Sequence, residues 1–307
     1  MLALLCPGQG SQRPGMLTEW WAAAERVGFD AREAVDRYST AAGLDLAELG
    51  CDADAETIRD TAHAQPLIVA LSILSWRIYQ QATGVIADLC VGHSVGEISA
   101  LAIAGILTDE DAVSLAAVRG RAMAKAAAET DTTMCALVGG KREDVLTAIK
   151  EAGAVVANVN GTRQVVAAGS SERIDALSAN LPRGVRAIPL SVAGAFHTEA
   201  MAPAVPAVAA AVEGLMTRSP NLVVLSNADG LEMIAGTQAA WRISEQITAP
   251  VRWDLCQVEM QRRGVTEAIE LAPSGVLAGL VKRDLPGVTT KALTPTDIAP
   301  SSTETPS

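Results

Sequence analysis

A serine flanked by glycines, placed between a short apolar run and a helical pattern, constrains the fold of this chain most strongly. The apolar run spans residues 87–91, residues 92–96 read Gly-His-Ser-Val-Gly, and the helical pattern follows over 97–104. This order matches Gly-x-Ser-x-Gly, in which small residues permit a sharp turn from strand to helix and helix N–H groups face a developing oxyanion. An ordinary turn uses the same residue types, but the strand before and the helix after favour Ser94 as a nucleophile.

A serine nucleophile needs a base, and histidine is the usual one. His93 adjoins Ser94 in the turn, so its side chain is expected to diverge from the hydroxyl and to pack beside the turn. His63 is expected to cap a helix or to face solvent. His197, the last of the three histidines, follows a predicted strand among small residues, which selects it as the base by elimination. Spacing singles out no acidic third member, and a backbone carbonyl orients an imidazole equally well, so the arrangement is a Ser–His dyad or a triad with an unidentified acid.

Two further segments bear on such a site. The residues Pro-Gly-Gln-Gly-Ser-Gln at 7–12 follow a predicted first strand and could approach the serine turn and donate a second oxyanion N–H. This loop lacks the Gly-Lys-Ser/Thr ending of a phosphate-binding loop, so nucleotide binding through it is not predicted. Arg119 lies on the second predicted helix after the serine. A buried guanidinium there would suit a carboxylate, but spacing alone favours an arginine that faces solvent.

The remaining pattern predicts the alternating strands and helices of an α/β protein. Strands are predicted at 2–6, 87–91, 134–138, 154–159, 164–168, 185–190, 223–226 and 265–271. Helices are predicted at 20–49 with a break near 43, from near 66 to 81, and at 97–104, 109–129, 143–152, 171–180, 203–216, 238–247 and 251–263. Between 134 and 190 the order is strand, helix, strand, strand, helix, strand. This is the ferredoxin-like arrangement, which can stand as a small subdomain inserted into a larger one.

Composition and charge exclude several classes of protein. The 24 Lys and Arg against 35 Asp and Glu give a net charge of −11, and aromatic residues make up 3 %, so no nucleic-acid partner is expected. No apolar run approaches the roughly 20 residues of a spanning helix, and the N-terminus does not read as a signal peptide, so no membrane association is expected. The five cysteines include no Cys-x-x-Cys pair, which argues against disulfides and a metal site and for the reducing cytoplasm.

Several short motifs occur together and in order along the chain. With the loop at 7–12 and the serine turn they are Gln65-Pro66, Arg119-Gly120, Gly194-Ala195-Phe196-His197-Thr198, Ser226-Asn227, Pro250-Val251-Arg252-Trp253 and Leu277-Ala278-Gly279-Leu280-Val281-Lys282-Arg283. Each motif is modest alone. The ordered set, which covers about residues 1–295, strongly resembles the malonyl-CoA:acyl-carrier-protein transacylases, the acyltransferases of dissociated (type II) fatty acid synthesis.

This resemblance implies an α/β-hydrolase-like core with an inserted ferredoxin-like subdomain. The expected division is a catalytic core of residues 1–130 and 192–295, a small subdomain of residues 131–191 and a flexible tail of residues 296–307. Ala272-Pro273-Ser274-Gly275 stands where the family often carries Gly-Pro-Gly, which leaves the local backbone conformation open.

The resemblance also implies roles for residues of the site. Ser94 would take the malonyl group as the nucleophile, and His197 would act as its general base and acid. The backbone carbonyl of Gln246 would orient His197. The backbone N–H groups of Gln9 and Val95 would form the oxyanion hole.

For the substrate, the resemblance reverses the expectation for Arg119, which would clamp the malonyl carboxylate. Asn160 would lie on the small-subdomain side of the cleft, near the CoA or pantetheine arm. Val95 and Phe196 fit malonyl better than methylmalonyl, because Phe196 would fill the space that an α-methyl branch needs.

The implied reaction is a ping-pong transfer of malonyl from malonyl-CoA to the phosphopantetheine thiol of acyl carrier protein, by a monomer without metal or bound cofactor. A serine hydrolase such as a thioesterase shares the serine turn but has no use for Arg119. A polyketide or malonate decarboxylase system would use the same transfer, and the intact site argues against a non-catalytic domain. An acidic carrier would need a local basic patch, for which Arg121, Lys125, Lys282 and Arg283 are candidates.

Overall fold

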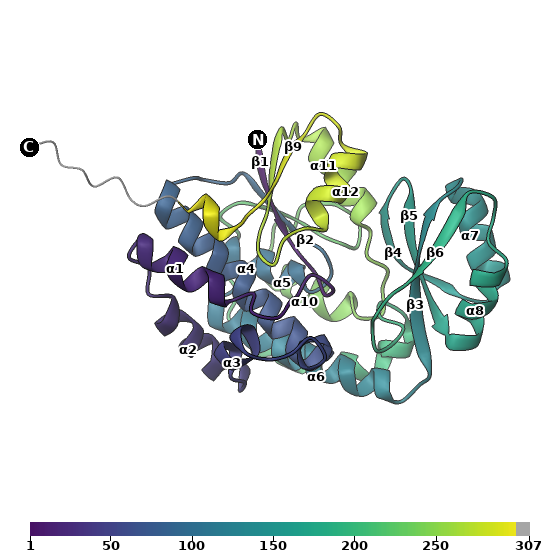
Figure 1. The fold of residues 1–307 in the computed structure, drawn as a ribbon, viewed down its shortest axis with the longest axis horizontal. Coiled ribbons are helices and arrows are strands. Elements are labelled where there is room, and N and C mark those ends of the chain that lie inside the picture. The colour runs from purple at the N-terminus through teal and green to yellow at the C-terminus, as the bar shows by residue number, and fades with distance from the viewer. Residues whose placement is uncertain (299–307) are drawn as a thin grey trace, which may run out of the picture.

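The computed structural model describes residues 1–298, and a five-stranded parallel sheet forms the centre of the larger part of the molecule (Figure 1). The strand order is β7-β2-β1-β8-β9, and every neighbouring pair is parallel. The strands are β1 (Leu2–Cys6), β2 (Leu89–Gly92), β7 (Val223–Leu225), β8 (Glu267–Glu270) and β9 (Thr289–Ala292). β1 and β2 are almost entirely apolar because both faces of the sheet are buried.

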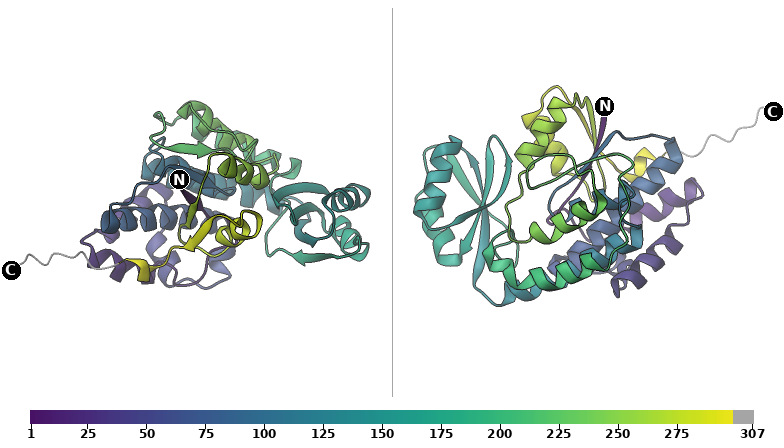
Figure 2. Two further views of the ribbon diagram at one scale, coloured as in Figure 1. Left: turned by 90° about the horizontal axis from the view of Figure 1, so that it is seen from above. Right: turned by 180° about the vertical axis from the view of Figure 1, so that it is seen from behind.

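Helices cover both faces of this sheet, as the turned views in Figure 2 show. Successive side chains of β1 point to opposite faces, so Ala3 and Leu5 pack against one layer of helices and Leu4 and Cys6 against the other. The first layer is α11 (Trp253–Arg262) and α12 (Leu277–Asp284). The second is α1 (Thr18–Arg26), α2 (Ala31–Ala42), α3 (Leu46–Cys51), α4 (Thr61–Thr83), α5 (Gly96–Ile103), α6 (Asp109–Ala128), α9 (Val205–Glu213) and α10 (Gly236–Glu245).

Four antiparallel strands in the order β4-β5-β3-β6 form a separate sheet, at the right of Figure 1. Its elements follow one another as β3 (Thr132–Gly139), α7 (Arg142–Glu151), β4 (Val155–Gly161), β5 (Gln164–Ser170), α8 (Ser171–Ala179) and β6 (Val185–Pro189). Apolar side chains of the strands and of α7 and α8 form a cluster of their own. The mixed α/β class and the predicted order of these six elements are confirmed.

The small sheet is joined to the larger part of the molecule through β4. The N–H of Val159 donates to the carbonyl of Val251 at 2.8 Å, and the N–H of Val251 donates to the carbonyl of Ala157 at 2.9 Å. Val251 lies just before α11, so backbone hydrogen bonds connect β4 with the segment that enters this helix.

Helix α4 begins at Thr61, earlier than the start predicted near Pro66. The carboxylate of Asp60 accepts the N–H of Ala62 and caps the helix, which places the helix start before the proline. Pro66 lies inside the helix, where it has no N–H to donate to the carbonyl four residues earlier. His63, expected ahead of the helix, therefore lies in its first turn.

The other differences concern short elements. The segment predicted as one helix at 203–216 is a 3-10 turn, η2 (Glu199–Ala204), followed by α9, with Pro203 in the turn and Pro206 at the start of the helix. The predicted break near residue 43 separates α2 from α3, but the sequence did not predict the second break, between α1 and α2, nor α12 and β9. The peptide bond between Ala272 and Pro273, in the departure from the family pattern, is cis.

Near the C-terminus, η3 (Pro295–Asp297) forms a 3-10 turn and Ile298 is only 2 % exposed. The flexible tail predicted from residue 296 therefore does not include residues 296–298, because the side chain of Ile298 packs in the core. The rest of that predicted tail, residues 299–307, lies outside the described residues. Within residues 1–298, no helix has both the length and the apolar character needed to cross a membrane.

Candidate active site

Ser94 lies in the turn between β2 and α5, where its backbone adopts a φ of 55°. A side chain at Gly92 would overlap the backbone of Gly96, and one at Gly96 would overlap the carbonyl of Cys6. The two glycines thus let α5 turn back directly above the ends of β1 and β2. The left-handed conformation of a non-glycine residue is strained, and here it presents the serine hydroxyl beyond the sheet.

We expect Gly96→Ala to lower the free energy of unfolding by about 3 kcal/mol, because the added methyl group has no space beside Cys6. Thermal unfolding measures the loss. The matched control is Gly279→Ala in α12, where an added Cβ meets no atom within 4 Å and helix propensity predicts a gain of up to about 1 kcal/mol. An unchanged melting temperature in Gly96→Ala would contradict the tight turn.

His197 is hydrogen-bonded to the serine through one ring nitrogen and to the backbone through the other. Its Nε2 lies 2.7 Å from Ser94 Oγ, and its Nδ1 lies 2.9 Å from the carbonyl oxygen of Gln246 at the end of α10. Because a carbonyl only accepts, Nδ1 carries the proton and the lone pair of Nε2 faces the hydroxyl. Burial, and then the charge of Arg119, lower the pKa of His197 to about 3. The imidazole is therefore neutral and able to accept a proton at physiological pH.

The other two histidines point away from the serine, as expected. His93 Nε2 lies 2.8 Å from the side-chain oxygen of Asn160 on β4, and its ring packs against Trp253. His63 Nδ1 donates to the carbonyl of Thr57 at 2.9 Å. Asn160 therefore lies at the end of the small sheet that is nearest to the serine turn.

Arg119 is completely buried on α6 and reaches the serine. Its Nη1 donates to Gln65 Oε1 at 2.8 Å, and its Nη2 donates to Gln246 Oε1 at 2.9 Å and lies 3.4 Å from Ser94 Oγ. These acceptors are all neutral, and Nε has no acceptor among the described residues. Burial lowers the pKa of Arg119 to about 10, so it stays charged near neutral pH.

The solvent-facing orientation that spacing alone favoured for Arg119 is therefore wrong. The physical reason lies in the next residue, because a side chain at Gly120 would lie 2.7 Å from the carbonyl oxygen of Thr61. Glycine lets α6 lie directly against the first turn of α4, which buries the neighbouring arginine.

The loop at 7–12 lies against the serine turn, as the sequence analysis expected. A Cβ at Gly8 would lie 2.6 Å from the carbonyl oxygen of His93, and Gln9 Nε2 donates to Thr61 Oγ1 at 3.1 Å. The backbone N–H groups of Gln9 and Val95 have no acceptor within residues 1–298. Two free N–H groups thus flank the turn that carries Ser94.

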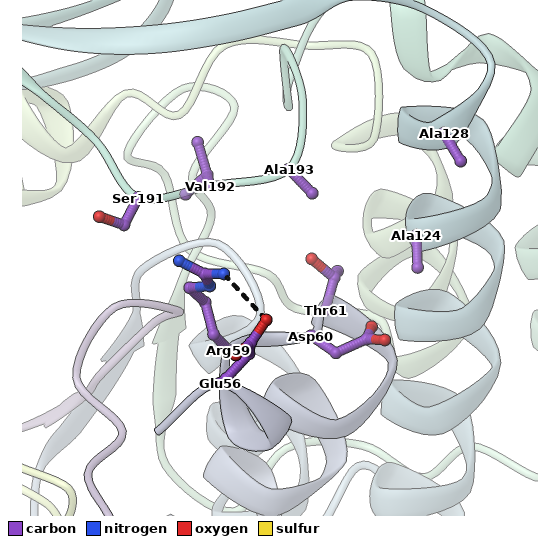
Figure 3. Close-up of a pocket in the computed structure, with 9 residues that line it drawn as sticks. All are labelled: Glu56, Arg59, Asp60, Thr61, Ala124, Ala128, Ser191, Val192 and Ala193. Carbon is purple, nitrogen blue, oxygen red and sulfur yellow. Dashed lines mark ion pairs between the residues drawn. The ribbon is translucent and has the colours of Figure 1, made fainter. Parts of the chain in front are cut away.

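A cavity of about 580 Å³ lies at the start of α4. Thr61, which holds the Gln9 side chain, faces it from the start of α4, opposite the segment of residues 191–193 (Figure 3). A second cavity, of about 630 Å³, has His197 in its lining together with residues of β4 and β5. Phe196 and Val95, the residues expected to favour malonyl, are both buried next to His197 and Ser94 in the chain.

Sequence reasoning gave no role to three buried residues of this region, Gln65, Glu97 and Asn227, although Gln65 and Asn227 belong to motifs quoted above and Glu97 directly follows the serine turn. No spacing rule connects them, because they come from α4, from α5 and from the residues after β7. Only the folded chain brings them to one place.

The four candidate docking residues lie on different faces of the parallel sheet. Arg121 and Lys125 belong to α6, whereas Lys282 and Arg283 belong to α12. Arg121 donates to the carbonyl of Ala42, and Arg283 pairs with the carboxylate of Asp284. They do not form a single basic patch.

A strained serine that is hydrogen-bonded to a neutral histidine, with free N–H groups and a buried arginine around them, forms a site suited to acyl transfer through a serine. The family model of the acyl transferase domain matches residues 3–300. The chain belongs to this acyl transferase family, and it is an acyltransferase.

Two similar proteins carry the same name. The malonyl CoA-acyl carrier protein transacylase of Mycobacterium tuberculosis (strain H37Rv) is 44 % identical over 301 residues, which cover 97 % of this chain and 98 % of the relative. The enzyme of the same name from Escherichia coli K12 is 33 % identical over 297 residues, 95 % of each chain.

Solved structures agree with these relatives. The crystal structure of the M. tuberculosis enzyme superposes with a TM-score of 0.88 at 43 % identity, over 97 % of this chain and 98 % of that one. A malonyl-transacylase in complex with its type II PKS acyl-carrier protein superposes with a TM-score of 0.88 at 32 % identity, over 98 % of both chains.

Proposed function

We propose that this chain transfers the malonyl group of malonyl-CoA to the phosphopantetheine thiol of an acyl carrier protein and so supplies extender units for fatty acid biosynthesis. The observation that carries the proposal is the buried Arg119, whose Nη2 lies 3.4 Å from Ser94 Oγ and whose acceptors are neutral. A buried cation without a carboxylate partner favours a substrate that brings one. The names of the relatives and the solved complex of a malonyl-transacylase with its carrier protein support the same substrates.

The reaction begins when His197 Nε2 takes the proton of the Ser94 hydroxyl. Ser94 Oγ then forms a bond to the thioester carbonyl, and the N–H groups of Gln9 and Val95 stabilise the oxyanion. When the tetrahedral intermediate collapses, the carbon–sulfur bond breaks and His197 returns its proton to the CoA thiolate. The second half repeats these steps in reverse, with the carrier thiol attacking the malonyl-serine and Ser94 leaving as the hydroxyl.

The carboxylate of a bound malonyl group would also change the pKa of His197. Arg119 lowers the pKa of His197 through its charge, and a bound carboxylate offsets that charge. His197 therefore becomes a stronger base when a dicarboxylic acyl group is in place. An acetyl group brings no such charge, so the same arrangement both binds malonyl and favours its transfer.

The remaining assignments are proposals as well. Phe196 and Val95 would exclude a branched acyl group, and Asn160 would border the pantetheine arm. We describe the residues 1–130 and 192–295 as an α/β-hydrolase-like core and residues 131–191 as its ferredoxin-like subdomain, which the two separate sheets support. The monomeric state and the cytoplasmic location are proposed on the sequence alone.

A serine hydrolase is the main competing function, and intact-protein mass spectrometry separates the two. On mixing with malonyl-CoA, the transferase is expected to retain a malonyl adduct that disappears only when a purified holo carrier protein is added. The carrier then gains the malonyl mass. Rapid release of free malonate without a carrier would support the hydrolase instead.

A further inference from the structure

Glu97 is a buried carboxylate that no step above uses. It lies in the first turn of α5, three residues after the nucleophile, and is 1 % exposed. Its Oε1 accepts the backbone N–H of Asn227 at 3.1 Å, and its Oε2 accepts a short hydrogen bond from Gln246 Nε2. Both hydrogen-bond partners of the carboxylate are donors, and two donors favour its ionised form over its protonated form.

Through Gln246 this carboxylate reaches the substrate-binding arginine. The Gln246 amide donates from Nε2 to Glu97 and to Asn227 Oδ1, the latter at 3.1 Å, and its Oε1 accepts Arg119 Nη2 at 2.9 Å. The two ends of a glutamine amide have nearly the same shape, and their partners decide which end points where. A carboxylate at Glu97 requires the nitrogen and so leaves the oxygen for Arg119.

Through Asn227 the same carboxylate reaches the nucleophile. Asn227 Oδ1 accepts the backbone N–H of Ser94 at 2.8 Å, and its Nδ2 donates to the carbonyl of Gly92 at 2.7 Å. These bonds hold both sides of the strained turn. The Glu97 carboxylate is therefore connected to Ser94 through Asn227 and to Arg119 through Gln246, in both cases by hydrogen bonds.

We infer that Glu97 is a positioning residue for malonyl transfer, which fixes the Gln246 amide so that its oxygen holds Arg119 in place for the substrate carboxylate. This inference rests on the proposed function. It concerns the orientation of groups and adds no covalent step. A protonated or amide side chain at position 97 presents a donor to Gln246, so the Gln246 amide turns over and sets its nitrogen against the guanidinium.

The protonation of Glu97 gives this role a pH dependence. Burial raises the pKa of Glu97 to about 7, against the opposing effects of the Asn227 N–H and of Arg119 and Arg242. Asp229, which pairs with Arg242 at 3.1 Å, raises it further, and Cys256 also faces the carboxylate. The organised state needs the ionised carboxylate, so it is present above about pH 7 and is lost as the pH falls through that value.

The decisive variant is Glu97→Gln, which keeps the shape and removes the charge. We expect the ratio of kcat/KM for malonyl-CoA to that for acetyl-CoA to fall by about tenfold, mainly through KM for malonyl-CoA, since a charged hydrogen-bond network is disturbed. Wild-type malonyl transfer should weaken below pH 7, whereas the variant should be uniformly weak across this range. In the free enzyme the pKa of His197, about 3, is too low to cause a loss of kcat/KM near pH 7, so this loss would report Glu97.

Glu270→Gln is the matched control, since Glu270 is equally buried and accepts only the N–H groups of Val276, Leu277 and Ala278. We expect it to lower the melting temperature without changing the malonyl-to-acetyl ratio or the acid limb. The inference is overturned when Glu97→Gln keeps the wild-type ratio and limb, or loses activity equally on both substrates.

If Glu97→Gln does not fold, the wild-type protein still provides the test. Its malonyl-to-acetyl ratio must then fall as the pH drops through 7, and a constant ratio would refute the role of Glu97. Failure of the proposed function looks different, because the wild-type enzyme would then release free malonate without a carrier or form no malonyl-serine at any pH.

Discussion

Ser94→Ala is expected to abolish the malonyl-enzyme and to reduce transfer to the carrier by about 10⁴-fold or more. In the proposed mechanism the hydroxyl oxygen forms the ester bond, and no other nucleophile within residues 1–298 lies within hydrogen-bond distance of His197 Nε2. The backbone N–H of residue 94 would keep its bond to Asn227 Oδ1, so the turn should survive the change. Intact mass after incubation with malonyl-CoA measures the adduct directly.

Ser99→Ala supplies the control for this variant. Ser99 lies on the same helix, and its buried hydroxyl has no hydrogen-bond partner in residues 1–298, so its removal should leave acylation unchanged. A malonyl adduct that persists on Ser94→Ala would exclude Ser94 as the nucleophile.

Arg119→Ala is expected to lower kcat/KM for malonyl-CoA by about 10² to 10³-fold and to affect acetyl-CoA far less. A charged hydrogen bond and ion pair in a water-excluded site are worth several times more than an exposed pair, which sets this magnitude. Only malonyl carries the carboxylate that the guanidinium would bind. Comparing the two thioesters in one assay cancels any general loss of folded enzyme.

Arg121→Ala is the matched control for Arg119→Ala. Arg121 lies on the same helix, but its guanidinium donates to the carbonyl of Ala42 at 3.1 Å and not to any residue of the site. We expect this variant to keep the malonyl-to-acetyl ratio of the wild-type enzyme. Equal losses on both thioesters in Arg119→Ala would show that the arginine supports the structure and does not select the substrate.

Local sequence was sufficient to predict the sharp turn that carries Ser94. The turn at Ser94 depends on glycines two residues to either side and on the elements directly before and after, all of which are visible in the sequence. His197 could be selected because the chain has only three histidines, of which one adjoins the serine and another lies near a helix start.

Burial of a polar side chain was harder to predict from sequence. Arg119 is buried because α6 and α4 approach closely at Gly120 and Thr61, a contact between segments far apart in the chain. The link from Glu97 to Gln246 spans a still longer separation and has no spacing pattern. The start of α4 differs from the one predicted near Pro66, because proline favours the first turn of a helix but Asp60 caps this one at Thr61.

The two backbone hydrogen bonds between β4 and Val251 have a mechanical consequence. Val251 follows Gln246 by only a few residues, so the strand that carries Asn160 is hydrogen-bonded to the same short stretch of backbone that carries the carbonyl bonded to His197. A displacement of the small sheet would pull on the base as well as on the wall of the site. A carrier protein that presses on that sheet would therefore change the alignment of proton transfer before its thiol reaches the serine.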